Sequence, residues 1–200
     1  MAKYKAVLFD ADGVIVKPQA KFSHQFAKKY GINPEGFQEF FEGDFTQAIK
    51  GKADLKEIII RYNHLWKWDS DPQELIDMWF ESENVIDTKL IVQIEKLRSE
   101  GVWVCLATHQ EKYRAKYMRE VMFPDAFDDY FISCDIGATK NSSVFWDYVL
   151  AKLQKSLPNV RTSEVLFFDD DDQNVATANM MGINGVLYHN AAQLEAVLST

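Results

Sequence analysis

The chain has 200 residues, 47% of them hydrophobic and 14% aromatic, so it can bury a core of its own and is unlike a disordered chain. A formal net charge of −8 argues against non-specific attraction to nucleic acid or to an anionic membrane. No signal peptide or membrane-length apolar run is visible and the two cysteines lack zinc-site spacing, so we expect a cytoplasmic protein without a membrane or nucleic-acid partner.

The first predicted element is a short strand that leads into two acids. The apolar run from Ala6 to Phe9 is typical of a strand covered on both faces of a parallel sheet, and Asp10 and Asp12 follow it. In an extended backbone both carboxylates would share one face, where they need water, an ion pair or a cation. Gly13 then permits a sharp change of direction. The alternative interpretation of this segment alone is a polar turn.

Residues 17–86 are expected to be helical, with no convincing strand. We predict four helices: Pro18 to Gly31, one from Pro34, Asp54 through Trp66, and one from Pro72. They would form a small bundle, the helical insertion (residues 17–86). It carries Trp66, Trp68 and Trp79. Aromatic side chains at helical spacing usually pack in a core, and the alternative is that one or two of these line a substrate pocket.

From residue 87 onward, predicted helices and strands alternate. We predict strands at 102–107, 130–133, 165–168 and 185–188. We predict helices at 88–100, after Thr108 to about 122, from Ser142 or Ser143 to about 155, at 174–181 and at 191–198. Such alternation gives a parallel sheet with helices on both faces. The expected fold is α/β, with a Rossmann-like core at 1–16 plus 87–200 and an all-helical domain at 17–86.

Polar residues stand at the carboxyl ends of the predicted strands, where open α/β sheets bind ligands. They are Asp10 with Asp12, Thr108, Lys140 in the loop after the third strand, and Asp169 with Asp170. Each has a simpler alternative. Thr108 would cap the next helix, Lys140 would lie on the surface, and residues 169–172 would form a solvated acidic turn.

Taken in order, these motifs resemble those of the haloacid dehalogenase (HAD) superfamily. The segment KAVLFDADGVIV is similar to its first motif, VCLATHQ to its second, the lysine of GATKNSS to its third and VLFFDDDDQN to its fourth. The resemblance covers residues 5–16 and 87–198, and the helical insertion stands where family members carry a cap. Two positions depart from the pattern, because Asn141 replaces a common proline and His109 a common asparagine.

Most HAD members are Mg²⁺-dependent phosphatases and phosphotransferases. The resemblance therefore implies a phosphatase for a small phosphorylated metabolite, such as a sugar phosphate. It implies that Asp10 attacks phosphorus to form an aspartyl-phosphate, while Asp12 donates a proton to the leaving oxygen and later takes one from water.

The resemblance also assigns the binding groups. Mg²⁺ would be held by the Asp10 carboxylate, the Asp12 backbone carbonyl and Asp170, with Asp169 assisting. Thr108 and Lys140 would hold the phosphoryl oxygens. His109 would either face solvent at a helix start or contact the substrate.

Three other functions share this fold. A phosphomutase would keep the same core residues and differ in how the cap controls water. A haloacid dehalogenase lacks the second aspartate, so Asp12 argues against that activity. A non-catalytic HAD-like binding domain would not need the full set of catalytic residues. We expect a monomer or a homodimer.

Overall fold

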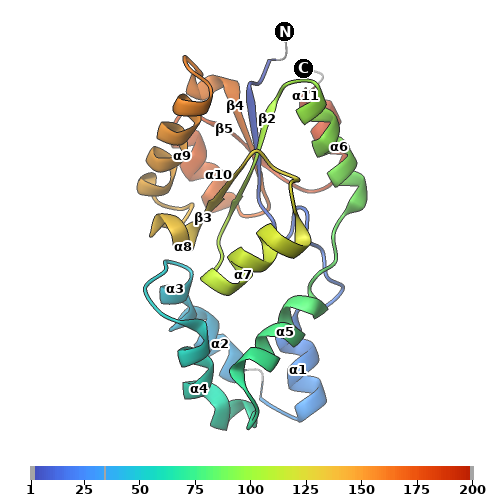
Figure 1. The fold of residues 1–200 in the computed structure, drawn as a ribbon, viewed down its shortest axis with the longest axis vertical. Coiled ribbons are helices and arrows are strands. Elements are labelled where there is room, and N and C mark those ends of the chain that lie inside the picture. The colour runs from blue at the N-terminus through green and yellow to red at the C-terminus, as the bar shows by residue number, and fades with distance from the viewer. Residues whose placement is uncertain (1–2, 34, 199–200) are drawn as a thin grey trace.

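The computed structural model describes residues 3–33 and 35–198, and its centre is a parallel sheet with helices on both faces (Figure 1). Among these residues the sheet has five strands in the order β3-β2-β1-β4-β5. The strands are β1 Ala6–Phe9, β2 Trp103–Thr108, β3 Asp129–Ile132, β4 Val165–Asp169 and β5 Asn184–Leu187. This is the Rossmann-like α/β fold that the alternating pattern predicts.

The helices form two groups (Figure 1). Those that cover the sheet are α6 Thr88–Ser99, α7 Lys112–Tyr117, the π-helical turn η1 Met118–Met122, α8 Ser133–Ile136, α9 Ser143–Ser156, the 3₁₀ turn η2 Thr162–Glu164, α10 Asp172–Met180 and α11 Ala192–Leu198. Those of the helical insertion are α1 Phe22–Tyr30, α2 Glu35–Glu42, α3 Phe45–Ala48, α4 Leu55–Trp66 and α5 Pro72–Ser82.

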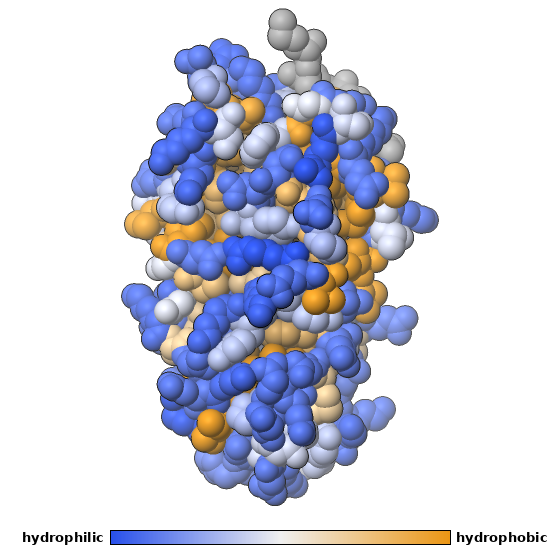
Figure 2. Space-filling view, viewed as in Figure 1, coloured by the Kyte–Doolittle hydropathy of each residue, from blue (hydrophilic) through white to orange (hydrophobic). Residues whose placement is uncertain are grey.

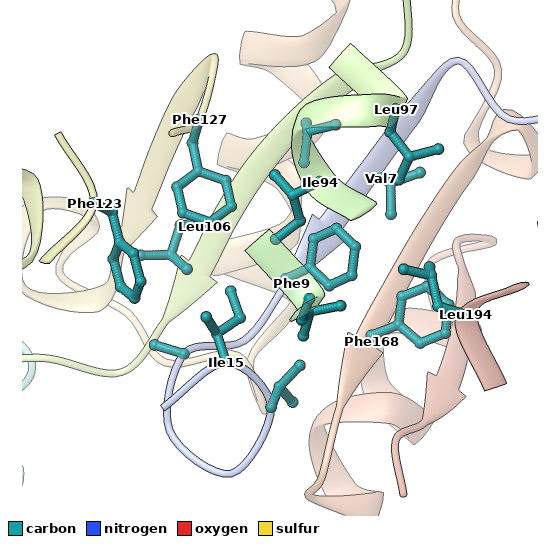
Figure 3. Close-up of a cluster of buried hydrophobic side chains, with 14 of the residues drawn as sticks. Val7, Phe9, Ile15, Ile94, Leu97, Leu106, Phe123, Phe127, Phe168 and Leu194 are labelled. Carbon is teal, nitrogen blue, oxygen red and sulfur yellow. The ribbon is translucent and has the colours of Figure 1, made fainter. Parts of the chain in front are cut away.

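Strand β1 lies at the middle of the sheet and is completely buried. Its side chains alternate between the two faces. Val7 and Phe9 join the cluster beneath α6 and α11, which Figure 3 shows. Ala6 and Leu8 join the cluster beneath α9 and α10. A strand covered on both faces needs apolar side chains at every position, and this is why the run at residues 6–9 predicts it correctly.

Helices α1 to α5 bury a hydrophobic cluster of their own. The chain enters and leaves this group along one short backbone pairing. Lys17 N–H donates to the Val85 carbonyl at 2.8 Å, and Asp87 N–H donates to the Ile15 carbonyl at 2.8 Å. The expected domain boundaries lie at this pairing, and the division into two domains stays a prediction.

Of the predicted helix starts in the insertion, one differs from the structure and one lies outside the described residues. Helix α1 begins at Phe22 and not at Pro18. The reason is a tertiary contact, because the Glu83 carboxylate beyond α5 accepts the Phe22 backbone N–H at 2.7 Å and fixes the first turn. The other predicted start, Pro34, lies outside the described residues, and α2 is described from Glu35.

Near the sheet, most predicted element boundaries differ little from the observed ones. The sequence predicts that Ser133 ends a strand, but this residue begins α8, and its buried hydroxyl accepts the Gln110 backbone N–H at 3.0 Å. Helix α10 begins at Asp172, before the predicted Asn174, because the Asp171 side chain caps it. Strands β2 and β5 are each shifted by a residue. The short helices α3 and α8 carry no periodic signal that predicts them.

The face shown in Figure 2 is mainly hydrophilic, with smaller hydrophobic areas between. The large exposed apolar side chains include Val92, Val144 and Met180, which lie on three different helices. Within residues 3–33 and 35–198, no helix combines the length and the apolar character needed to cross a membrane.

Candidate active site

The parallel register brings the predicted site residues to one edge of the sheet. Strand β1 pairs with β2 on one side and β4 on the other, and Phe9 lies opposite Phe168. The pairing extends to the acid, because the Asp10 backbone N–H donates to the Phe168 carbonyl at 2.9 Å. Asp10, Thr108 and Asp169 therefore meet where strands β1, β2 and β4 end.

Lys140 bridges two of these acids. Its Nζ lies 2.6 Å from Asp10 Oδ1 and 2.7 Å from Asp169 Oδ2, and its side chain is 1% exposed. Burial alone would lower the pKa of Lys140, but the two carboxylates outweigh burial and raise it, so the ammonium stays charged. Burial raises the pKa of Asp10 to about 7, and the Lys140 ammonium opposes that shift. Lys140 is thus a buried site residue and not a surface lysine.

The loop that carries Lys140 is well anchored although Asn141 replaces the more common proline. The Thr139 hydroxyl donates to Asn141 Oδ1 at 2.6 Å. The Lys140 backbone N–H donates to His109 Nε2 at 2.5 Å, and its carbonyl accepts the Trp146 indole N–H at 2.7 Å. These contacts keep the lysine at the site without the proline.

His109 holds this loop through its ring. Burial, and then the Lys140 charge, lower the pKa of His109 to about 3, so the imidazole is neutral and can accept at Nε2. The residue lies before α7, which starts at Lys112, so it is not a solvent-facing helix start. His109 also lines the cavity described below, and its contact with a substrate stays a prediction.

Three carboxylates form a candidate metal site. Oxygens of Asp10, Asp169 and Asp170 lie within 4.8 Å of one another. An all-oxygen set of this kind suits a hard divalent cation such as Mg²⁺. Burial, and then the charge of Asp169, raise the pKa of Asp170, and a cation would relieve that repulsion. A Cβ on Gly13, whose φ is +84°, would come within 2.0 Å of Asp170 Oδ2, so only glycine lets these loops approach.

Hydrogen bonds from the segment that follows β4 hold the Asp169 side chain in place. It is 0% exposed, and its Oδ1 accepts the Asp171 backbone N–H at 2.8 Å. The amide of Asn174 lies 3.3 Å from both of its oxygens. A solvated acidic turn therefore describes Asp171 and Asp172 but not Asp169. Thr108 is also buried, at the end of β2.

Asp12 has contacts that the sequence did not reveal. Gln110 Nε2 donates to Asp12 Oδ2 at 2.6 Å, and Arg114 Nη2 lies 4.0 Å from Asp12 Oδ1. Glu111, which is also buried, caps α7 by accepting the backbone N–H groups of Tyr113 and Arg114. The available signal is that the polar segment HQEKYR follows a buried strand, yet spacing alone does not tell which of its side chains turn inward.

A cavity of about 870 Å³ extends from Asp12 to the helical insertion. Its side at the sheet is polar, and the aromatic wall on the other side is formed by Phe37, Phe41, Phe45, Trp79 and Phe80. Trp79 lines the cavity, whereas Trp66 and Trp68 are buried in the cluster of the insertion. Core packing thus describes Trp66 and Trp68, and a role of Trp79 in a substrate pocket stays a prediction.

Comparison with known proteins identifies the family of the chain. A family model described as haloacid dehalogenase-like hydrolase matches residues 4–182. Bifunctional epoxide hydrolase 2 of Mus musculus is 24% identical over 221 residues. This alignment covers 98% of the present chain but 39% of the mouse protein, so the chain spans well under half of that relative.

Solved structures agree on the fold. The HAD family enzyme BT-2542 of Bacteroides thetaiotaomicron is 21% identical, over 96% of this chain and 98% of that one, with a TM-score of 0.79. It has also been solved in complex with magnesium and inorganic phosphate. A dehalogenase with an intermediate complex is 16% identical, over 100% and 99% of the two chains, with a TM-score of 0.69. The motifs, the sheet and the family match lead to one conclusion: the chain belongs to the haloacid dehalogenase-like hydrolases.

Proposed function

We propose that this protein is a Mg²⁺-dependent phosphatase that hydrolyses a small phosphorylated metabolite through an aspartyl-phosphate on Asp10. The observation that carries the proposal is the buried Asp10–Lys140–Asp169 network, with Asp12 two positions beyond Asp10 at the mouth of a cavity. A nucleophile, a fixed cation and a second carboxyl are the groups that phosphoryl transfer requires.

The reaction has two steps. An Asp10 oxygen attacks phosphorus, the bond to the ester oxygen breaks, and Asp12 gives a proton to the departing oxygen. Water then attacks the phosphorus of the aspartyl-phosphate and gives a proton to Asp12. The bond between phosphorus and the Asp10 oxygen breaks, so phosphate leaves and the Asp10 carboxylate is restored. Throughout, Lys140 and the Thr108 hydroxyl hold phosphoryl oxygens and the nucleophile.

The acidic cluster of Asp10, Asp169 and Asp170 would hold Mg²⁺, with the Asp12 backbone carbonyl as a further ligand. When bound, the cation would offset the repulsion between these carboxylates and a phosphate dianion. The network of Lys140 and Asn174 around Asp169 keeps the cluster in place.

The cavity supports a role of the insertion in substrate choice. Its volume of about 870 Å³ is in the range of sites that enclose a whole small metabolite. The residues at the sheet edge would act on any phosphate ester in the same way. The aromatic wall would therefore act as the cap and select substrates by the shape of the leaving group. Trp79 and Phe41 offer ring faces for a sugar or another apolar group.

Two other activities are alternatives to a phosphatase. A dehalogenase shares the fold but lacks an aspartate two positions after the nucleophile, so the presence of Asp12 argues against that activity. A phosphomutase would use the same residues, and release of inorganic phosphate from a sugar phosphate separates it from a phosphatase.

The test is hydrolysis of 4-nitrophenyl phosphate and acetyl phosphate by the purified protein, with Mg²⁺ and with EDTA. We expect phosphate release that requires the cation and is lost in Asp10→Asn. Activity that persists in EDTA, or in Asp10→Asn, would overturn the proposal. A panel of phosphorylated metabolites would then rank the substrates.

A further inference from the structure

Gln110 makes a contact with Asp12 that no part of the motif pattern predicts. Its Nε2 donates to Asp12 Oδ2 at 2.6 Å, although the residues are 98 positions apart. A carboxylate only accepts hydrogen bonds, so the amide nitrogen must face it. The contact is therefore a short, charge-assisted hydrogen bond between two loops of the sheet edge.

The core holds Gln110 firmly. The residue is 6% exposed, and its backbone N–H donates to the Ser133 hydroxyl at 3.0 Å. The same hydroxyl lies 3.3 Å from the Gln110 carbonyl oxygen, to which it donates. Ser133 is itself completely buried at the start of α8. The amide thus belongs to the fixed part of the site and not to the helical insertion.

Asp12, in contrast, has a side chain that is 53% exposed. Such a side chain would otherwise change rotamers freely. Arg114, which is 4% exposed, faces its other oxygen, with Nη2 at 4.0 Å from Asp12 Oδ1. Among the described residues, that Nη2 has no hydrogen-bond acceptor, while Nη1 donates to the Phe80 carbonyl at 3.2 Å. Gln110 is therefore the direct anchor of Asp12, and Arg114 a fixed positive charge beside it.

We propose that Gln110 is a positioning residue that orients Asp12 for proton transfer to the leaving oxygen. This inference rests on the proposed function. Because Oδ2 of Asp12 accepts the amide N–H, Oδ1 is left to carry the transferable proton. As the P–O bond breaks, its electron pair stays on the leaving oxygen, and that oxygen takes the proton from Oδ1. Asp12 becomes a carboxylate, and Gln110 and Arg114 stabilise the charge as it forms.

The proposed role of Gln110 predicts that the loss of kcat/KM in a Gln110 variant depends on the leaving group. An alkoxide must be protonated as it leaves, whereas 4-nitrophenolate leaves without a proton. Gln110→Met removes the donor and keeps the side-chain length. We expect it to lower kcat/KM for 2-phenylethyl phosphate about tenfold or more, and for 4-nitrophenyl phosphate about twofold or less. A purely structural role would lower both values equally.

A double-mutant cycle sharpens the test. In an Asp12→Ala background, Gln110→Met should cost nothing further with 2-phenylethyl phosphate, because Gln110 acts through Asp12. The control is Gln154→Met, an exposed glutamine on α9, which should leave both substrates unaffected. If Gln110→Met fails to fold, Gln110→Asn is the second variant. Its shorter side chain keeps the amide but moves it away from Asp12, so we again expect a larger loss with 2-phenylethyl phosphate than with 4-nitrophenyl phosphate.

Three outcomes would overturn the inference. Equal losses with both esters, or an added loss in the Asp12→Ala background, would show that Gln110 acts on the fold or on another group while the phosphatase assignment stands. Absence of Mg²⁺-dependent turnover of 4-nitrophenyl phosphate by the unmodified protein would reject the proposed function, and with it this role of Gln110.

Discussion

The sheet edge lines the cavity through Asp12 and Asp170, and the aromatic wall lines its other side, but the two regions are stabilised in different ways. At the sheet edge, Asp10, Lys140 and Asp169 are buried charged groups, and each depends on the others for compensation. The aromatic wall is built from ring contacts, such as Trp79 with Phe41 and with Phe45, both at 5.7 Å between centroids. Such contacts are individually weak.

This difference predicts that the sheet edge and the aromatic wall have different roles. A network of paired charges tolerates little change, because removing one partner leaves another buried and uncompensated. Removing one ring from the aromatic wall leaves no buried charge without its partner. We therefore expect substitutions at the sheet edge to abolish chemistry, and substitutions in the aromatic wall to change which esters are preferred.

The largest effect is expected for Lys140→Ala. Without the ammonium, Asp10 and Asp169 face each other in the core, so the metal-free protein should lose about 3–5 kcal/mol of unfolding free energy. Turnover should fall about 10²-fold or more. Urea unfolding in EDTA and steady-state kinetics measure both quantities. Lys155→Ala, an exposed lysine on α9, is the control, and equal small effects of the two substitutions would contradict the comparison.

Asp12→Ala should affect chemistry and leave stability nearly unchanged. The side chain is about half exposed, so its loss removes little packing. Turnover should fall about 10²-fold, the usual scale of general acid–base catalysis. Circular dichroism and urea unfolding verify the fold while kinetics report the loss. A near-normal rate would show that Asp12 is not the acid/base group.

Phe41→Ala and Trp79→Ala should change substrate ranking. Each removes a ring from the aromatic wall, and we expect the ratio of kcat/KM values between two bulky esters to shift about tenfold. Acetyl phosphate, which is too small to reach the wall, should be nearly unaffected. Ile60→Ala, an exposed residue of α4, is the control. An unchanged ranking in folded variants would place selection in the core loops, at His109 and Asn141.

The smallest effect concerns Glu111, which is buried at the start of α7. Burial raises the pKa of Glu111 to about 7, although two backbone N–H groups favour its charged form. A raised pKa means that folding favours the protonated carboxyl, so this contribution is full at low pH and is lost as pH rises through about 7. We expect a loss of about 1 kcal/mol between pH 6 and pH 8.

Glu111→Gln isolates this contribution. Gln has no charge to bury, so the difference in unfolding free energy between Glu111→Gln and the unmodified protein should grow from pH 6 to pH 8. Urea unfolding at several pH values measures it. A constant difference would show that the backbone donors keep Glu111 ionised throughout.

The sequence alone determined the fold class and placed most residues of the candidate site. The strand at residues 6–9 follows from a continuous apolar run, and the start of α5 at Pro72 follows from the preference of proline for the first turn of a helix. Asp10, Asp12, Thr108 and Asp169 could be placed because parallel strands end at a common edge. All of these signals lie within a few residues of what they predict, which is why they can be read without a structure.

The tertiary structure decided what depends on contacts between distant segments. The Gln110–Asp12 bond joins residues 98 positions apart, and the start of α1 depends on Glu83, 61 positions away from Phe22. Which tryptophan lines the cavity depends on how five helices pack, because Trp66 and Trp79 have the same local pattern. A side chain's partner across the fold is set by the position of whole elements, and periodicity within one element carries no information about that position.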